Sequence, residues 1–132
     1  MGDIKIIKAS DCSSETTQTP GMLRLAGISL ETAGSERLWM GFVTMKGGAK
    51  SGAHHHGHCG SGIYIIRGHA RFRWGERLEN VAEAGPGDFI YVPPQLIHQE
   101  MNPSPTEPIE MIVARDCAEG IVVNVQVEAA DS

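Results

Sequence analysis

Short apolar runs recur along the whole chain, and in several of them apolar and polar residues alternate. Alternation with a period of two is typical of β-strands that bury one face. The pattern predicts strands over residues 4–7, 22–29, 38–45, 63–66, 70–74, 89–92, 109–114 and 121–127. No stretch has a sustained helical period of apolar residues with a cap at each end. We therefore expect an all-β protein.

Turn-forming residues separate these runs. The chain contains 16 glycines and seven prolines, which stand between the expected strands, as in the Gly-Pro-Gly-Asp sequence at 85–88. Many short strands at nearly regular spacing predict a sandwich or a barrel. Residues 10–20 are polar and are expected to form a loop. No repeat or long linker divides the chain, so residues 1–132 are predicted to form a single domain.

Charge and targeting signals narrow the classes of partner. The formal net charge of -5 gives no general phosphate-binding field, so a nucleic-acid partner is not expected. No apolar run has the length of a membrane span, and the N-terminus lacks the apolar core of a secretory signal. The three cysteines, Cys12, Cys59 and Cys117, are far apart and form no C-x-x-C pair. These features predict a soluble cytoplasmic protein with free thiols and no membrane partner.

The histidines are strongly clustered. Four of the six are His54, His55, His56 and His58. On a strand, His54 and His56 lie on the same face, roughly 6–7 Å apart along the backbone, and can converge on one metal ion. His58 can join the same ion only if the chain bends, which the neighbouring glycines allow. The cluster alone is also compatible with a solvated polar loop or a tag.

Two spaced motifs distinguish these possibilities. The first has the form G(X)5HXH(X)3-4E(X)6G over residues 48–68, with Gly48, His54, His56, Ser61 and Gly68 at its fixed positions. The second has the form G(X)5PXG(X)2H(X)3N over residues 87–102. Its fixed positions hold Gly87, Pro93, Gln95, His98 and Asn102. Together the motifs resemble those of the cupin superfamily.

This resemblance implies a double-stranded β-helix, the jelly-roll barrel of cupins. It further implies that His98 lies beside His54 and His56, and that the three hold one divalent metal ion near one end of the barrel interior. Homodimers are common in this superfamily, so a homodimer is expected by analogy. The strand containing Trp39, Met40 and Phe42 would make the dimer contacts.

The sequence departs from the motifs at two positions. Gly60 and Ser61 stand where the family has its carboxylate ligand, and Gln95 replaces a glycine, which we expect to affect only a turn. Two metal sites remain open: three histidines, similar to those of oxygen-using iron cupins, or four with His58, similar to the zinc sites of cupin polyketide cyclases. Imidazole ligands favour zinc or iron(II), with nickel or copper as alternatives and manganese less suited.

Glu100 is the candidate catalytic residue. It follows His98 by two positions, so alternation places both side chains on one face. Glu100 would act as a general acid or base, or would orient an imidazole; the alternative is a paired surface carboxylate. Cys59 is interpreted as a bystander thiol next to the site, and His69 as a surface or hydrogen-bonded residue of a barrel strand.

These features predict a metal-dependent enzyme acting on a small organic molecule. Two reactions are considered, an iron-dependent oxygenation and a zinc-assisted cyclisation or isomerisation. The alternatives are a non-catalytic module that binds a metal or metabolite, and a storage or structural cupin.

Overall fold

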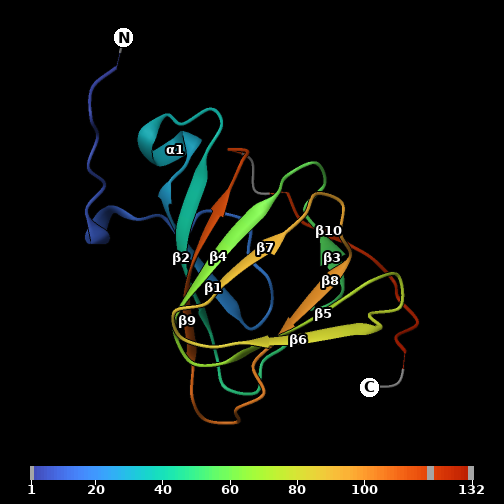
Figure 1. Cartoon of the computed structure of the whole chain (residues 1–132). Coiled ribbons are helices and arrows are strands. Elements are labelled where there is room, and N and C mark those ends of the chain that lie inside the picture. The colour runs from blue at the N-terminus through green and yellow to red at the C-terminus, as the bar shows by residue number, and fades with distance from the viewer. Residues whose placement is uncertain (1, 119–120, 131–132) are drawn as a thin grey trace.

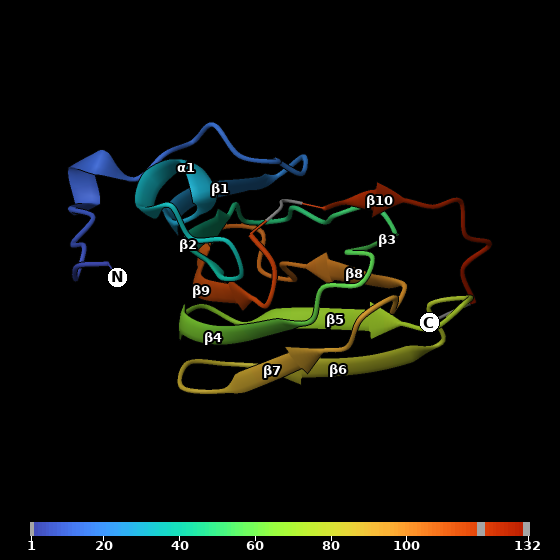
Figure 2. The ribbon, with the colours of Figure 1, turned by 90° about the horizontal axis from the view of Figure 1, so that it is seen from above.

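The computed structural model describes residues 2–118 and 121–130, and two antiparallel five-stranded sheets dominate this part of the chain (Figure 1). The first sheet has the strand order β1 (Met22–Ile28), β2 (Trp39–Met45), β9 (Ile109–Arg115), β4 (Ser61–Arg67) and β7 (Phe89–Val92). The second has the order β10 (Val123–Asn124), β3 (His54–His55), β8 (His98–Met101), β5 (Ala70–Trp74) and β6 (Asn80–Ala84). Figure 2 shows the N-terminal segment and the segment after β10 at opposite ends of the molecule. Among the described residues, no helix is long and apolar enough to span a membrane.

The core forms because alternate residues of the strands face inward. In β9, Ile109, Met111, Val113 and Arg115 are buried while the residues between them are partly exposed. Strands β2 and β4 show the same alternation at their first five positions. The inward residues of the first sheet pack against residues such as Phe72 from the second sheet. The hydrophobic pattern therefore decides which face of each strand enters the core.

Most predicted strands are confirmed with small changes at their ends. The runs at 70–74 and 89–92 match β5 and β7, while β9 extends one residue beyond the predicted 109–114. The run at 121–127 contributes only the two residues of β10. Strand β6 was not predicted because four of its five residues are exposed and it therefore lacks an apolar alternation.

The prediction of an edge strand at residues 4–7 is wrong. Ile4 and Ile6 are exposed, and no ladder pairs this segment with either sheet within the described residues. A short 3-10 helix, η1 (Ala9–Asp11), overlaps the start of the loop predicted at 10–20. One turn of helix, α1 (Leu30–Ala33), follows β1. It begins at a capping box in which Ser29 and Thr32 exchange hydrogen bonds.

The prediction of free thiols is wrong for two of the three cysteines. Cys59 and Cys117 form a disulfide with their Cα atoms 5.8 Å apart, and Cys12 is free. The sequence separation of 58 residues gave no sign of this pairing, because it depends on the fold bringing the start of β4 beside the end of β9. The cysteines therefore no longer support the prediction of a cytoplasmic protein.

Candidate metal centre

Three histidines, one each from β3 and β8 and one from just after β3, meet in the interior at the second sheet. His54 of β3 and His98 of β8 are direct partners across the antiparallel ladder. His56 is the first residue after β3 and, two positions beyond His54, points to the same side of the chain. Their ring centroids lie 4.4 Å apart for His54 and His98, 5.0 Å for His54 and His56, and 5.2 Å for His56 and His98. All three side chains are buried.

Backbone carbonyls fix the orientation and tautomer of each ring. The Nδ1 atoms of His54, His56 and His98 each lie 2.8 Å from a carbonyl oxygen, those of Gly52, Ile121 and Leu96 respectively. A carbonyl oxygen only accepts, so each Nδ1 carries the hydrogen and donates it. Each Nε2 is therefore left with a lone pair, and one ring nitrogen from each histidine lies within 4.8 Å of those of the other two. Imidazoles held in this way are typical of metal ligands.

Burial favours the neutral form of His54 and His56. It lowers the pKa of His56 to about 3, and the nearby Arg115 guanidinium acts in the same direction. Burial also lowers the pKa of His54, although the Glu100 carboxylate opposes that shift. Neutral imidazole is the form that binds a metal ion.

Glu100 projects from β8 onto the same inner face as His98, as alternation predicts. Its Oε2 lies 4.0 Å from His54 Nε2, and both atoms are buried with no hydrogen-bond partner. Burial raises the Glu100 pKa, but electrostatic interactions with the imidazole rings of His98 and His54 and with the Arg24 guanidinium act in the opposite direction, and the net shift is to a lower pKa. The surface-carboxylate alternative is wrong, since Glu100 is 5% exposed.

The two departures from the motifs have clear structural counterparts. Ser61 and Glu100 line the same small cavity, so a carboxylate enters this space from β8 in place of the one absent at Ser61. Gln95 adopts a φ of 66°, a conformation in which glycine is usual, and its backbone N–H donates to the carbonyl of Gly57. The expectation that this substitution affects a turn is consistent with that conformation.

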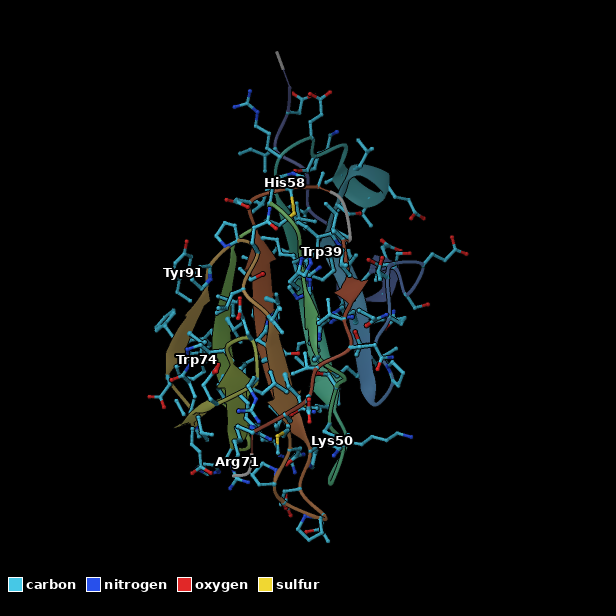
Figure 3. All side chains as sticks on the ribbon, turned by 90° about the vertical axis from the view of Figure 1, so that its right-hand side faces the viewer. Trp39, Lys50, His58, Arg71, Trp74 and Tyr91 are labelled. Carbon is cyan, nitrogen blue, oxygen red and sulfur yellow. A yellow bond between two sulfur atoms is a disulfide. The ribbon has the colours of Figure 1, made fainter. Side chains whose placement is uncertain are left out.

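The structure does not bring His58 to the other three histidines. His58 is exposed at one end of the sheets (Figure 3), where it groups with Cys59 and Cys117. The disulfide occupies both sulfurs of that group. The four-histidine arrangement therefore has no geometric support within the described residues.

Two buried arginines beside the triad were missed by the sequence analysis. Arg24 of β1 and Arg115 of β9 are 2% and 3% exposed and line a cavity of about 10 Å³ with Ser61, His56 and Glu100. Burial lowers the pKa of Arg115 to about 10, which leaves it charged at neutral pH. Alternation in the sequence could have identified both arginines, because each occupies one of the alternate positions of its strand that face inward.

A larger pocket is also lined in part by His98. Its volume is about 580 Å³, and aromatic and aliphatic side chains make up most of its wall. Val92 and His98 line both this pocket and the small cavity. Figure 3 shows Trp74 and Tyr91, two residues of its wall, on the same side of the molecule. The pocket therefore provides an apolar approach to the triad.

The sequence match extends over most of the two sheets. Residues 41–115 match the model of the Cupin domain family, which is more than half of the chain. The chain therefore belongs to the cupin family, and the resemblance of its two motifs is confirmed. No curated protein matches the chain.

Solved structures share the fold at low sequence identity. The polyketide cyclase RemF from Streptomyces resistomycificus has a TM-score of 0.76 and 20% identity, with 95% of this chain and 87% of that chain covered. Oxalate decarboxylase from Bacillus subtilis at pH 4.6 has a TM-score of 0.74 and 22% identity, with 95% and 33% covered. This chain therefore spans about one third of that enzyme's length. An uncharacterized protein from Klebsiella pneumoniae with a double-stranded beta-helix domain has a TM-score of 0.69 and 16% identity, with 94% and 99% covered.

Proposed function

We propose that this cupin is a metal-dependent enzyme acting on a small organic molecule, with His54, His56 and His98 holding one divalent transition-metal ion. The observation that carries the proposal is the set of three buried imidazoles whose Nδ1 hydrogens are all donated to backbone carbonyls. This arrangement leaves an Nε2 lone pair on each ring, and one ring nitrogen from each histidine lies within 4.8 Å of those of the other two.

The surrounding atoms also fit a bound cation. His54 Nε2 and Glu100 Oε2 are electron-pair donors that face each other at 4.0 Å, buried and without partners. A buried polar atom without a partner is costly, and a cation near both would remove that cost. When bound, the ion supplies Lewis-acid polarisation of a substrate oxygen.

Glu100 is proposed as the general base. The low pKa of its carboxyl group keeps it ionised at neutral pH, so Oε2 accepts a proton rather than donating one in the first step. The carboxylate faces the cavity that also contains Ser61 and the triad. A substrate atom placed there would lose its proton to Oε2.

The pocket favours cyclisation or isomerisation of an apolar substrate. Four aromatic side chains and several aliphatic ones line it: Phe72, Trp74, Phe89, Tyr91, Ile90, Val92 and Leu96. Such a wall suits a flat, largely apolar molecule. The fold of RemF, a polyketide cyclase, supports this choice. We expect zinc for this reaction, whereas iron would favour the oxygenase alternative.

Elemental analysis of protein purified without a metal-affinity tag tests the proposal. We expect about one equivalent of zinc per chain, as for a single preformed site. Iron at that level would redirect the search to oxygen-uptake assays. Protein that takes up no metal after reconstitution with zinc and iron(II) would contradict the proposed function.

A further inference from the structure

The polar atoms left without partners in the protein interior gather around one small cavity. In the part of the chain that the structure describes, the buried side-chain nitrogen and oxygen atoms without a hydrogen-bond partner are Arg24 Nε, His54 Nε2, Ser61 Oγ, Glu100 Oε2 and Arg115 Nε. Four of these residues line the cavity of about 10 Å³, and the fifth, His54, faces Glu100. Unpartnered buried polar atoms are rare in folded proteins, so their concentration at one place indicates a ligand.

The arginines are only partly satisfied by the protein. The Nη1 atom of Arg24 donates to the Thr19 hydroxyl oxygen at 2.8 Å and to the Thr17 carbonyl oxygen at 3.2 Å. Arg115 lies over the ring of Trp39, with its Cζ atom 4.8 Å from the ring centroid. Neither guanidinium forms an ion pair with a carboxylate anywhere in residues 2–118 and 121–130.

The charges around the cavity do not balance. Two guanidinium groups and one carboxylate, that of Glu100, line the cavity, so its positively charged side chains outnumber its negatively charged one. A metal ion on the triad would increase this excess. Buried charges are normally paired, so the cavity favours an anionic group.

We propose that Arg24 and Arg115, together with the Ser61 hydroxyl group, form a subsite for an acidic oxygen of the substrate, such as a carboxylate, enolate or phenolate. The cavity has room for about one water-sized group, so the anionic end enters it while the apolar body remains in the larger pocket. Val92 and His98 line both spaces, which places the two spaces next to each other. The inference rests on the proposed function and narrows its substrate class to aromatic or polyenoic acids and enols.

The test uses benzoate and benzamide, which have nearly the same shape and differ in charge. Binding to the metal-free protein is measured by isothermal titration calorimetry. Charge-assisted hydrogen bonds predict that benzoate binds at least roughly tenfold more tightly than benzamide. Equal affinities for the two compounds, or no binding of benzoate, would overturn the proposal.

Substitutions then test whether the preference for benzoate over benzamide depends on the two arginines. Arg24→Met and Arg115→Met are each expected to abolish most of it, since each removes a charge and keeps an apolar stem. The control is Arg71→Met, because Arg71 is exposed, pairs with Glu83 and lies toward the opposite end of the sheets from His58 (Figure 3). A benzoate preference that survives both methionine substitutions would contradict the subsite. If the methionine variants do not fold, the glutamine variants are measured; they remove the charge but keep a polar side chain, and a loss of preference is again required.

The use of metal-free protein separates this proposal from the proposed function. A benzoate preference that depends on the arginines, in a protein that binds no metal, would support the subsite and contradict the metalloenzyme. Metal binding without any preference for benzoate would leave the metalloenzyme and remove the subsite.

Discussion

The tautomers of the histidines distinguish the proposed ligands from a neighbour in the same sequence cluster. His54, His56 and His98 donate from Nδ1 to carbonyl oxygens. His55 instead accepts the backbone N–H of Gly57 at its Nδ1, so its Nε2 carries the hydrogen. His55 therefore presents no free Nε2 lone pair, although it lies between two of the proposed ligands. The sequence contains these histidines in one run, but local hydrogen bonds give them different roles.

Substitution of His98 tests the triad. His98→Ala removes the imidazole contributed by the second motif and is expected to weaken zinc binding by more than roughly 100-fold, since loss of an outer partner alone costs 10–100-fold. Zinc affinity is measured by competition with a chromophoric chelator. His58→Ala is the matched control, because His58 is exposed and groups with the disulfide. Undiminished zinc binding in His98→Ala would contradict the site, and a large loss in His58→Ala would restore the four-histidine arrangement.

The neutral imidazoles predict sensitivity of the metal-free protein to acid. The folded-state pKa of His56, about 3, lies below its ordinary value of 6.5, because burial and the Arg115 charge disfavour protonation. The unfolded chain therefore binds the proton first as pH falls. The contribution of His56 to the free energy of unfolding is fully present above pH 6.5. It falls by at most about 1.4 kcal/mol per pH unit as the pH decreases toward 3.

Urea unfolding across this range in the presence of chelator measures that slope. His56→Asn is expected to reduce it, and His69→Asn, at an exposed position, is expected to leave it unchanged. An identical slope in His56→Asn and the unaltered protein would rule out this explanation.

At the scale of elements, the disulfide joins two segments that support the triad. Cys59 lies three residues after His56, and Cys117 lies four residues before Ile121, whose carbonyl accepts the His56 Nδ1 hydrogen. The Asp116 carboxylate also accepts the backbone N–H of Gly60, which adds a second link between the same segments. The end of β9 is therefore tied to the turn before β4 by both covalent and polar contacts.

Loss of this disulfide should lower the free energy of unfolding. Cys117→Ser opens a loop with a sequence separation of 58, for which chain entropy predicts a loss of about 4 kcal/mol. Urea unfolding with and without a reductant measures the effect, and Cys12→Ser is the control because Cys12 is free. If a reductant leaves the unfolding midpoint of the unaltered protein unchanged, the disulfide does not contribute to stability in solution.

At the scale of the whole molecule, the outer face of the first sheet presents two apolar rows. Strand registers align Met40, Ala114, Gly62 and Tyr91 in one row, and Phe42, Ile112, Tyr64 and Phe89 in the next. Of the residues expected to make dimer contacts, Met40 is exposed and belongs to these rows. Trp39 does not belong to them, because it is buried in the core at 1% exposure.

This face is where we expect the homodimer to form. Tyr64→Glu places a charge in the middle of the rows and is expected to convert the dimer to a monomer, because a buried unpaired charge opposes association. Light scattering coupled to size-exclusion chromatography measures the mass. Leu30→Glu is the control, since Leu30 is exposed on α1. A monomeric unaltered protein, or a dimer that persists in Tyr64→Glu, would contradict this interface.

The sequence by itself determined the strand pattern, the cupin motifs and three of the residues at the centre. Alternation sets which side chains face inward and places His54 and His56 on one face, because both depend on local geometry. The position of His98 beside them was implied by the resemblance to the cupin motifs. Alternation also placed Glu100 on the face of His98. The ends of the strands were less certain, and the prediction for 109–114 omitted Arg115 at the next inward position.

Only the tertiary structure decided which distant residues share the site. Arg24, Ser61 and Arg115 come from the first sheet and meet the histidines across the interior, and the pairing of Cys59 with Cys117 depends on the same packing. No local pattern records such contacts, because they depend on how two sheets face each other rather than on the order of residues within one strand. His58, close to the triad in sequence, is separated from it for the same reason: the chain turns after His56 toward the disulfide.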